Sequence, residues 1–154
     1  MELEKLIDAD CVIPKLSASS KKQALRELSQ HAADQTGQSQ QEIFDALLER
    51  ERLGTTGVGG GVAIPHGKLS SLDELYGLFA RLETPIDFES IDEQPVDLIF
   101  LLLAPESAGA DHLKTLSRVS RLLRDKAVCE KLRNCESCEN LLTLITDRTV
   151  SLAS

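Results

Sequence analysis

The sequence predicts an α/β fold, a single-domain sandwich in which a mixed β-sheet is flanked by helices on both sides. The length of 154 residues fits one domain with one core. Segments with helical periodicity occupy both ends of the chain, and short apolar segments of strand length occupy its middle. Helices, then strands, then helices are typical of a sheet covered by helices. We expect one domain over residues 1–154, with its core from about residue 3 to residue 147.

Two amphipathic helices are predicted first. Ser19 or Ser20 caps the first helix and Gly37 lies beyond its end, while Ser39-x-x-Glu42 is a capping box for the second, which Gly54 ends. The predicted apolar faces are Ala24, Leu25, Leu28 and Ala32 in the first helix, and Ile43, Phe44, Leu47 and Leu48 in the second.

The middle of the chain changes pattern. Residues 54–61, GTTGVGGG, cannot form a stable helix interior, because glycine costs about 1 kcal/mol at each such position. The run VDLIFLLL is apolar on both faces, which is typical of a central strand or of a buried helix, and Pro95 and Pro105 bracket it at strand length. Strands are therefore predicted over residues 62–64, ending at Pro65, over 75–82 and over 96–103.

Three further helices are predicted in the last third of the chain. A short one covers residues 126–133, and Ser137 caps the last. The apolar positions are Leu113, Leu116, Val119, Leu122 and Leu123 in the first of the three, and Leu141, Leu142, Leu144 and Ile145 in the last.

Charge and apolar runs exclude several classes of function. The formal net charge of −8 repels nucleic acid on average. The longest apolar run, residues 98–104, is far shorter than the roughly 20 residues that span a bilayer, and the N-terminus lacks the apolar region of a secretion signal. We therefore expect a cytoplasmic protein without direct membrane insertion.

The four cysteines favour free thiols over a metal site. Cys135 and Cys138 form a single C-x-x-C motif, and Cys129 could add a third ligand, but no histidine follows at a usable spacing. A metal or redox role is the alternative reading. We expect no metal and no cofactor.

The glycine-rich stretch does not match a nucleotide-binding motif. In GVGGGV, Val62 stands where the third glycine of G-x-G-x-x-G belongs. A P-loop needs Ser or Thr after Gly-Lys, and Leu69 follows Gly67-Lys68.

The three histidines differ in their surroundings. His31 lies at the border of the first helix's apolar face and is expected to be a half-exposed side chain. His66 follows Pro65 at the end of a short strand, where functional side chains often lie, although its spacing fits a loop histidine without chemistry equally well. His112 lies near the first turn of a helix, where the helix dipole favours a neutral imidazole and a nearby anion, although taken alone its position fits a histidine without chemistry better.

Residues 49–68, ERERLGTTGVGGGVAIPHGK, closely resemble the active-site region of the IIA proteins of the bacterial phosphoenolpyruvate phosphotransferase system, of the mannitol–fructose type. Residues 84–106 and 108–125 resemble the same proteins, in the same order, and the nitrogen-regulatory branch matches best. The resemblance covers nearly the whole chain and implies the same fold, a mixed sheet flanked by helices.

The resemblance also implies roles for single residues. His66 matches the phosphorylated histidine, His112 the second active-site histidine, and Arg50 the arginine that faces the phosphoryl group. Arg52, two residues away, is the alternative for the arginine. Thr55 and Thr56 could add hydroxyl groups, and the glycine-rich backbone could present N–H groups.

The function that the resemblance implies is a phosphohistidine carrier rather than a turnover enzyme. It would accept a phosphoryl group from an HPr-like phosphocarrier protein and regulate partners such as potassium transporters, sensor kinases and nitrogen-linked metabolism. Two alternatives remain at this point: a sugar-specific IIA component that passes phosphate to a IIB domain, and a binding module that has lost phosphotransfer.

Overall fold

The computed structural model describes residues 3–135 and 137–146. Along the chain lie α1 (Leu3–Leu6), a 3₁₀ turn (Ala9–Cys11), β1 (Val12–Leu16), α2 (Lys21–Thr36), α3 (Gln40–Arg52), β2 (Gly57–Gly59), β3 (Val62–Ala63), β4 (His66–Leu69), β5 (Tyr76–Ile86), β6 (Val96–Pro105), α4 (Ala110–Arg124), α5 (Lys126–Asn134) and α6 (Cys138–Thr146).

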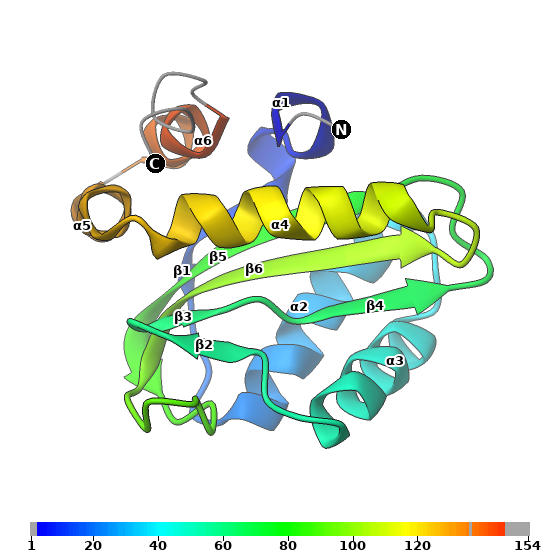
Figure 1. The fold of residues 1–154 in the computed structure, drawn as a ribbon, viewed down its shortest axis with the longest axis horizontal. Coiled ribbons are helices and arrows are strands. Elements are labelled where there is room, and N and C mark those ends of the chain that lie inside the picture. The colour runs from blue at the N-terminus through cyan, green and yellow to red at the C-terminus, as the bar shows by residue number, and fades with distance from the viewer. Residues whose placement is uncertain (1–2, 136, 147–154) are drawn as a thin grey trace.

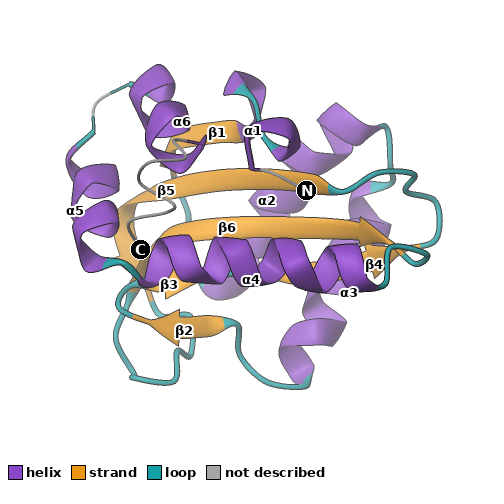
Figure 2. Cartoon of the chain, turned by 45° about the horizontal axis from the view of Figure 1, so that its top comes forward, coloured by secondary structure: helices purple, strands orange, loops and turns teal. Residues whose placement is uncertain are grey.

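The sheet is mixed and lies between two layers of helices. Its strand order is β1-β5-β6-β3-β2, and β4 also pairs with β6. β5 and β6 are antiparallel, whereas β1 runs parallel to β5, and β3 and β4 run parallel to β6. α2 and α3 cover one face, and α4, α5 and α6 cover the other (Figure 1, Figure 2). The predicted α/β sandwich is confirmed.

The helix boundaries follow the predicted caps. Ser20 Oγ accepts a hydrogen bond from the Gln23 N–H, and Ser39 Oγ accepts one from the Glu42 N–H. Gly37 ends α2 in the left-handed conformation at a φ of 76°. In the last helix, Ser137 Oγ accepts from the Asn140 N–H at 3.1 Å.

The central strand is β6, as the apolar run predicts. Residues 98–103 are fully buried, because helices cover both faces of the sheet at this point. The buried-helix alternative is therefore wrong. The predicted strand over residues 75–82 is β5, which extends to Ile86.

The strand predicted to end at Pro65 continues beyond it. Val62 pairs with Leu98 and His66 pairs with Leu102, so β3 and β4 share one register along β6. Pro65 lacks an N–H, but its carbonyl accepts a hydrogen bond from the Leu102 N–H at 3.0 Å, which keeps the ladder intact. His66 thus begins a second strand segment.

The buried face of α4 differs from the prediction. Leu113 is 67% exposed, whereas His112 and Thr115 are buried. The apolar pattern placed Leu113 inside, but the helix turns its polar neighbours toward the sheet. Val119, Leu122 and Leu123 are buried as predicted.

The sequence analysis predicts no element before residue 19, yet residues 3–16 contain α1, the 3₁₀ turn and β1. β1 contains Pro14 and, among the described strands, pairs with β5 alone at the edge of the sheet, where a missing N–H is tolerated.

Candidate functional site

The candidate site lies where β4 passes between α3 and α4 (Figure 1). Its centre is His66, the first residue of β4, whose side chain is half-buried. The β6 ladder holds the backbone on one side. On the other side α3 packs close to β4, since a Cβ built on Gly67 would lie 3.5 Å from the Cβ of Ala46. The imidazole is therefore held on a rigid strand.

Hydrogen bonds define the tautomer of the His66 imidazole. Nδ1 lies 2.8 Å from the carbonyl oxygen of Ile64, which can only accept, so Nδ1 carries the proton. Nε2 accepts a hydrogen bond from Nε of Arg50 at 3.3 Å. The lone pair of the neutral ring is thus on Nε2, on the side of the guanidinium.

Arg50 lies in the last turn of α3. Its Nη1 donates to the carbonyl oxygen of Gly54 at 2.9 Å, so the guanidinium is tied to the backbone that follows the helix while Nε faces His66. Arg52 points elsewhere and pairs with Glu49 on the surface at 3.2 Å. Of the two arginines, the fold brings Arg50 to His66.

His112 lies at the start of α4 beside His66. The two ring centroids are 5.9 Å apart, at an interplanar angle of 62°. His112 is only 5% exposed, and its Nε2 has no hydrogen-bond partner among the described residues. The three residues singled out from the sequence therefore lie together, whereas His31 is exposed on α2.

Both site histidines favour the neutral form. Burial lowers the pKa of His66 below its ordinary value of 6.5, and the Arg50 cation acts in the same direction, while the Ile64 carbonyl and Glu51 oppose it. Burial also lowers the pKa of His112, and the charges of His66 and Lys68 add to this effect. At neutral pH the site presents two uncharged imidazoles.

A buried ion pair next to Arg50 was not found by the sequence analysis. Glu51 pairs with Nζ of Lys21 at 2.9 Å and accepts hydrogen bonds from the N–H and the hydroxyl of Thr56. These contacts fix the backbone of residues 54–56 to the end of α3 and to the start of α2. A glutamate one residue from a charged surface pair carries no signal of burial in the sequence.

The hydroxyl groups and glycines proposed from the resemblance are used within the fold. The Thr55 hydroxyl donates to the carbonyl of Phe88, and the Thr56 hydroxyl donates to Glu51. The Gly60 N–H donates to Asp92 Oδ2 at 3.0 Å. Gly57 is required because a Cβ there would lie 2.4 Å from Oγ of Ser90. These groups shape the loop and have partners of their own.

The three cysteine side chains that the structure describes form their hydrogen bonds away from the site residues, with Gln35, Leu123 and Ser137. Cys11 and Cys129 are buried free thiols, and Cys135 is half-buried and free. Burial raises the pKa of the Cys11 thiol to about 11. The side chain of Cys138, the second cysteine of the C-x-x-C motif, lies outside the described residues.

A sequence model of the family described as phosphoenolpyruvate-dependent sugar phosphotransferase system, EIIA 2, matches residues 5–148. The match includes every element from β1 to α6, together with His66, Arg50 and His112. The chain belongs to this family.

Individual relatives refine the comparison. A nitrogen regulatory protein of Bradyrhizobium diazoefficiens is 55% identical over 145 residues, which are 94% of this chain and 95% of the relative. A fructose-specific EIIA component of Haloferax volcanii is 42% identical over 104 residues, 68% of each chain. The crystal structure of the nitrogen regulatory protein IIA-Ntr from Neisseria meningitidis has a TM-score of 0.90 at 33% identity, covering 94% of this chain and 99% of that one.

Within the part of the chain that the structure describes, no helix combines the length and the apolar character needed to cross a membrane.

Proposed function

We propose that this protein is a cytoplasmic IIA phosphocarrier of the nitrogen-regulatory branch. It accepts a phosphoryl group on His66 from an HPr-like phosphocarrier protein and regulates its partners through its phosphorylation state. The observation that carries the proposal is the His66 imidazole, neutral and half-buried, with Nδ1 bound to a carbonyl and Nε2 beside a guanidinium.

This geometry supports the following transfer step. The Nε2 lone pair attacks phosphorus in line with the P–N bond of the donor phosphohistidine, and that bond breaks as its electron pair returns to the donor nitrogen. The new P–N bond draws charge from the ring, so the Nδ1–H bond to the Ile64 carbonyl strengthens. No proton needs to leave His66 during the step.

Arg50 and His112 stabilise the transferring group. The hydrogen bond from Arg50 to Nε2 is long, at 3.3 Å, and the guanidinium turns from the nitrogen to the phosphoryl oxygens as the phosphoryl group arrives. His112 lies close enough, with its ring centroid 5.9 Å away, to donate an N–H to the same oxygens. Phosphohistidine as donor requires no metal ion.

The regulatory role is supported by the nitrogen regulatory relative, which shares 55% identity over 94% of this chain. A phosphoryl group adds about −1.5 to −2 charges to one surface, which changes the affinity for a partner that binds there. Potassium transporters, sensor kinases and proteins of nitrogen-linked metabolism are the partners that we expect.

The second candidate is a sugar-specific IIA component. The fructose-specific relative, 42% identical over 104 residues, favours it to a lesser degree because the match is shorter. Such a protein would pass its phosphoryl group rapidly to a cysteine of a cognate IIB domain. Single-turnover transfer to purified fructose and mannitol IIB domains separates the two candidates.

Intact mass after incubation with phosphoenolpyruvate and the two upstream proteins tests the proposal. We expect the mass of one phosphoryl group, stable in base and lost in acid. His66→Ala is expected to gain no mass, whereas His31→Ala, on the exposed side of α2, is expected to be labelled like the parent chain. Full labelling of His66→Ala would refute the assignment.

A further inference from the structure

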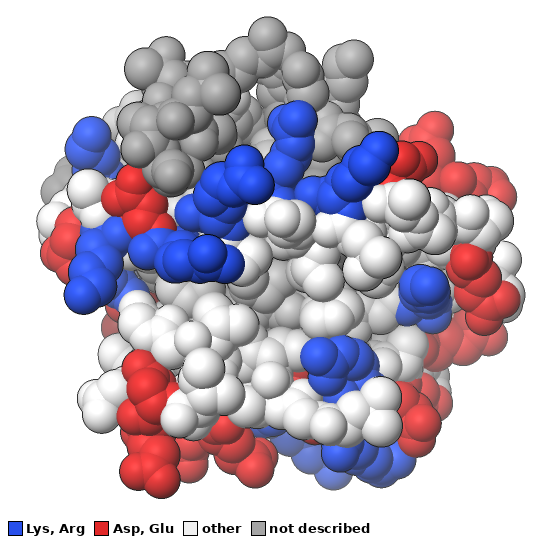
Figure 3. All heavy atoms as spheres, in the orientation of Figure 1, with Lys and Arg blue, Asp and Glu red and all other residues white. Residues whose placement is uncertain are grey.

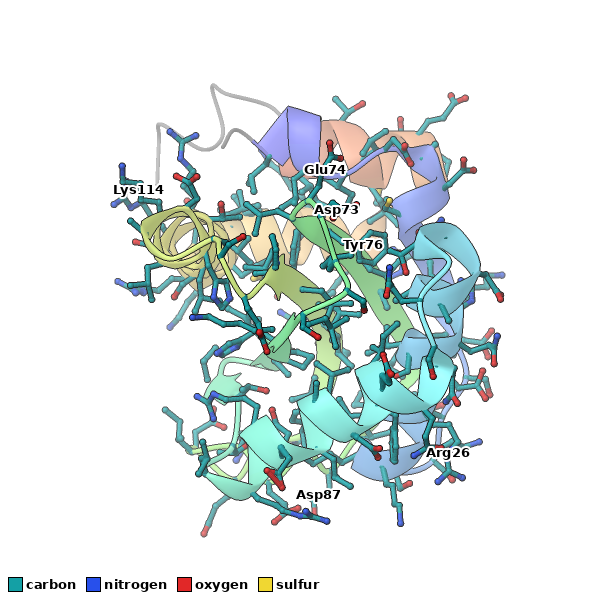
Figure 4. All side chains as sticks on the ribbon, turned by 90° about the vertical axis from the view of Figure 1, so that its right-hand side faces the viewer. Arg26, Asp73, Glu74, Tyr76, Asp87 and Lys114 are labelled. Atoms are coloured by element: carbon teal, nitrogen blue, oxygen red, sulfur yellow. The ribbon has the colours of Figure 1, made fainter. Side chains whose placement is uncertain are left out.

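The outer side of α4 carries a row of cations in an acidic protein. Lys114, Arg118, Arg121 and Arg124 are all exposed, and the only carboxylate of the helix is Asp111, in its first turn. The whole chain has 17 Lys and Arg against 25 Asp and Glu. Figure 3 shows Lys and Arg side chains gathered over α4 and its junction with α5, and Figure 4 shows Lys114 pointing away from the sheet. We call these four residues the cationic stripe.

The charges of the cationic stripe are not paired with described carboxylates of the same chain. No ion pair joins any of its members to a carboxylate among the described side chains. Elsewhere the same fold pairs opposite charges at i,i+3, as in Glu49–Arg52 and Glu130–Arg133. Within the stripe the i,i+3 and i,i+4 neighbours have like charge, which destabilises a helix, and Asp111, three residues before Lys114, forms no ion pair with it.

The helix dipole accounts for only part of this pattern. Arg121 and Arg124 lie in the last turn, where cations are favourable, but Lys114 lies near the N-terminus, where they are not. Four exposed cations therefore lie along one side of α4 with no acidic residue between them. An anionic partner bound there would relieve their mutual repulsion.

We propose that the cationic stripe binds an acidic, amphipathic helix of a partner protein. The ten-residue separation of Lys114 and Arg124 spans about 15 Å of helix, and successive cations are three or four residues apart. Glutamates with the same helical spacing on a neighbouring helix lie opposite them. Leu113, 67% exposed beside Lys114, offers an apolar contact that such a helix uses and a phosphate backbone does not.

Charge around the stripe disfavours a long polyanion. Exposed Glu106 and Asp111 lie at its N-terminal end. Beyond its C-terminal end the charges are mixed, since exposed Lys126 and Lys131 flank Glu130, which pairs with Arg133. A DNA or RNA backbone that continued past the N-terminal end of α4 would meet the two carboxylates there and a net charge of −8. A short acidic helix, unlike a nucleic-acid backbone, need not extend past the stripe and so avoids these carboxylates.

The N-terminal end of the stripe and the proposed phosphorylation site lie on opposite sides of the first turns of α4. His112, whose ring is 5.9 Å from that of His66, lies two residues before Lys114 on the same helix. Provided that the proposed function holds, a phosphoryl group on His66 adds negative charge near the N-terminal end of the stripe. The acidic helix therefore binds the unphosphorylated chain more tightly.

Binding of a synthetic helix to the full chain tests the stripe without phosphorylation. The probe is an amphipathic peptide with glutamates at i, i+4, i+7 and i+10, the spacing of the four cations, beside a leucine stripe. Its matched version has glutamines instead. Calorimetric titration is expected to give salt-sensitive binding of the glutamate peptide, with NMR shift changes confined to α4 and its surroundings. Arg118→Glu/Arg121→Glu is expected to weaken binding about tenfold.

The matched control is Lys15→Glu/Lys22→Glu, which changes the net charge equally at exposed positions on β1 and α2 and is expected to leave the affinity unchanged. Arg118→Gln/Arg121→Gln removes the like-charge neighbours, so it keeps the fold and still loses affinity. Three results would overturn the proposal: equal binding of the glutamine peptide, equal weakening by both charge reversals, or tighter stripe-dependent binding of a DNA duplex or an anionic vesicle.

A second titration uses the chain phosphorylated on His66. The affinity for the glutamate peptide is expected to fall about fivefold. An unchanged affinity would contradict the coupling between stripe and site. A chain that accepts no phosphoryl group would contradict the proposed function instead and would leave the first titration standing.

Discussion

The reactivity proposed for His66 depends on which nitrogen keeps the proton. The Ile64 carbonyl holds it on Nδ1, and Arg50 faces the lone pair on Nε2. The carbonyl belongs to the residue two positions earlier, where β3 gives way to β4. The tautomer of the His66 imidazole is thus set by the interruption between β3 and β4 at Ile64 and Pro65, which places the Ile64 carbonyl beside Nδ1.

Replacement of Arg50 tests its role at the same scale. Arg50→Ala is expected to slow phosphoryl acceptance about 10²- to 10³-fold, because a positioned donor to the transferring group is lost. Arg50→Lys is expected to recover part of the rate, since the charge remains without the paired N–H groups. Single-turnover kinetics with the phosphorylated donor measures both.

Arg52→Ala is the matched control, because Arg52 lies in the same turn of α3 but pairs with Glu49 on the surface. We expect its rate to equal that of the parent chain. A rate loss in Arg52→Ala as large as that in Arg50→Ala would contradict the assignment.

The pH dependence of stability follows from the two site histidines. Their pKa values are lowered in the folded chain, so the neutral forms are favoured there. As the pH falls through 6.5, the unfolded chain takes up protons more readily than the folded one, and stability is lost. Above 6.5 both states are neutral at these positions, and this contribution is constant.

Chemical denaturation across this pH range measures the effect. The free energy of unfolding is expected to decrease below pH 6.5, and His112→Gln is expected to flatten part of the decrease. An increase in stability on acidification through this window, attributable to either histidine, would show that the folded state favours the charged ring.

At the scale of elements, the end of α3 connects the site to α2, the other helix of the same layer. Glu51 is buried and links Lys21 of α2 to the Thr56 backbone, one residue from Arg50. Glu51→Ala is expected to lower the free energy of unfolding by about 3 kcal/mol, since it leaves a backbone N–H unpaired and leaves the largely buried Lys21 ammonium with only the exposed Glu89 carboxylate, 3.9 Å away.

Glu49→Ala is the comparison for this prediction. Its pair with Arg52 is mostly exposed, and its loss is expected to cost less than about 0.5 kcal/mol. Urea unfolding of the two variants measures the difference. Equal losses would mean that the buried pair contributes no more than the surface pair.

The elements themselves differ in how far the sequence predicts them. α2, α3, α5 and α6 follow from caps and periodicity, and β6 follows from its apolar run, because these signals are local. β1 and β4 do not, since Pro14 and the Pro65–Gly67 segment contain residues that argue against a strand. Pairing with β5 and β6 overrides that preference.

The candidate site likewise has a part that the sequence predicts and a part that only the fold reveals. The resemblance identifies His66, Arg50 and His112, and the fold brings them together. The buried roles of Glu51 and of His112 on the inner face of α4 arise from contacts between distant segments. Periodicity predicted Leu113 on that face, because a periodic pattern reports which side chains are apolar. It does not report which groups of the sheet lie opposite the helix.

At the scale of the whole molecule, one continuous core joins the layers. Buried side chains from β1 to α6 belong to a single cluster. Arg81 of β5 adds a polar tie, since it donates to the Pro14 carbonyl at 3.0 Å and to the Leu132 carbonyl at the end of α5 at 2.8 Å. We propose on this basis that residues 1–154 form one domain.

The central claim is that Nε2 of His66 accepts the phosphoryl group. ³¹P and ¹⁵N NMR of the enzymatically phosphorylated, histidine-labelled chain tests it most directly, because phosphorus couples to the nitrogen that it binds. The account predicts a single P–N coupling, to Nε2 of His66, with Nδ1 still protonated against the Ile64 carbonyl. Phosphorus on Nδ1 of His66, on His112 or on any other side chain would contradict it.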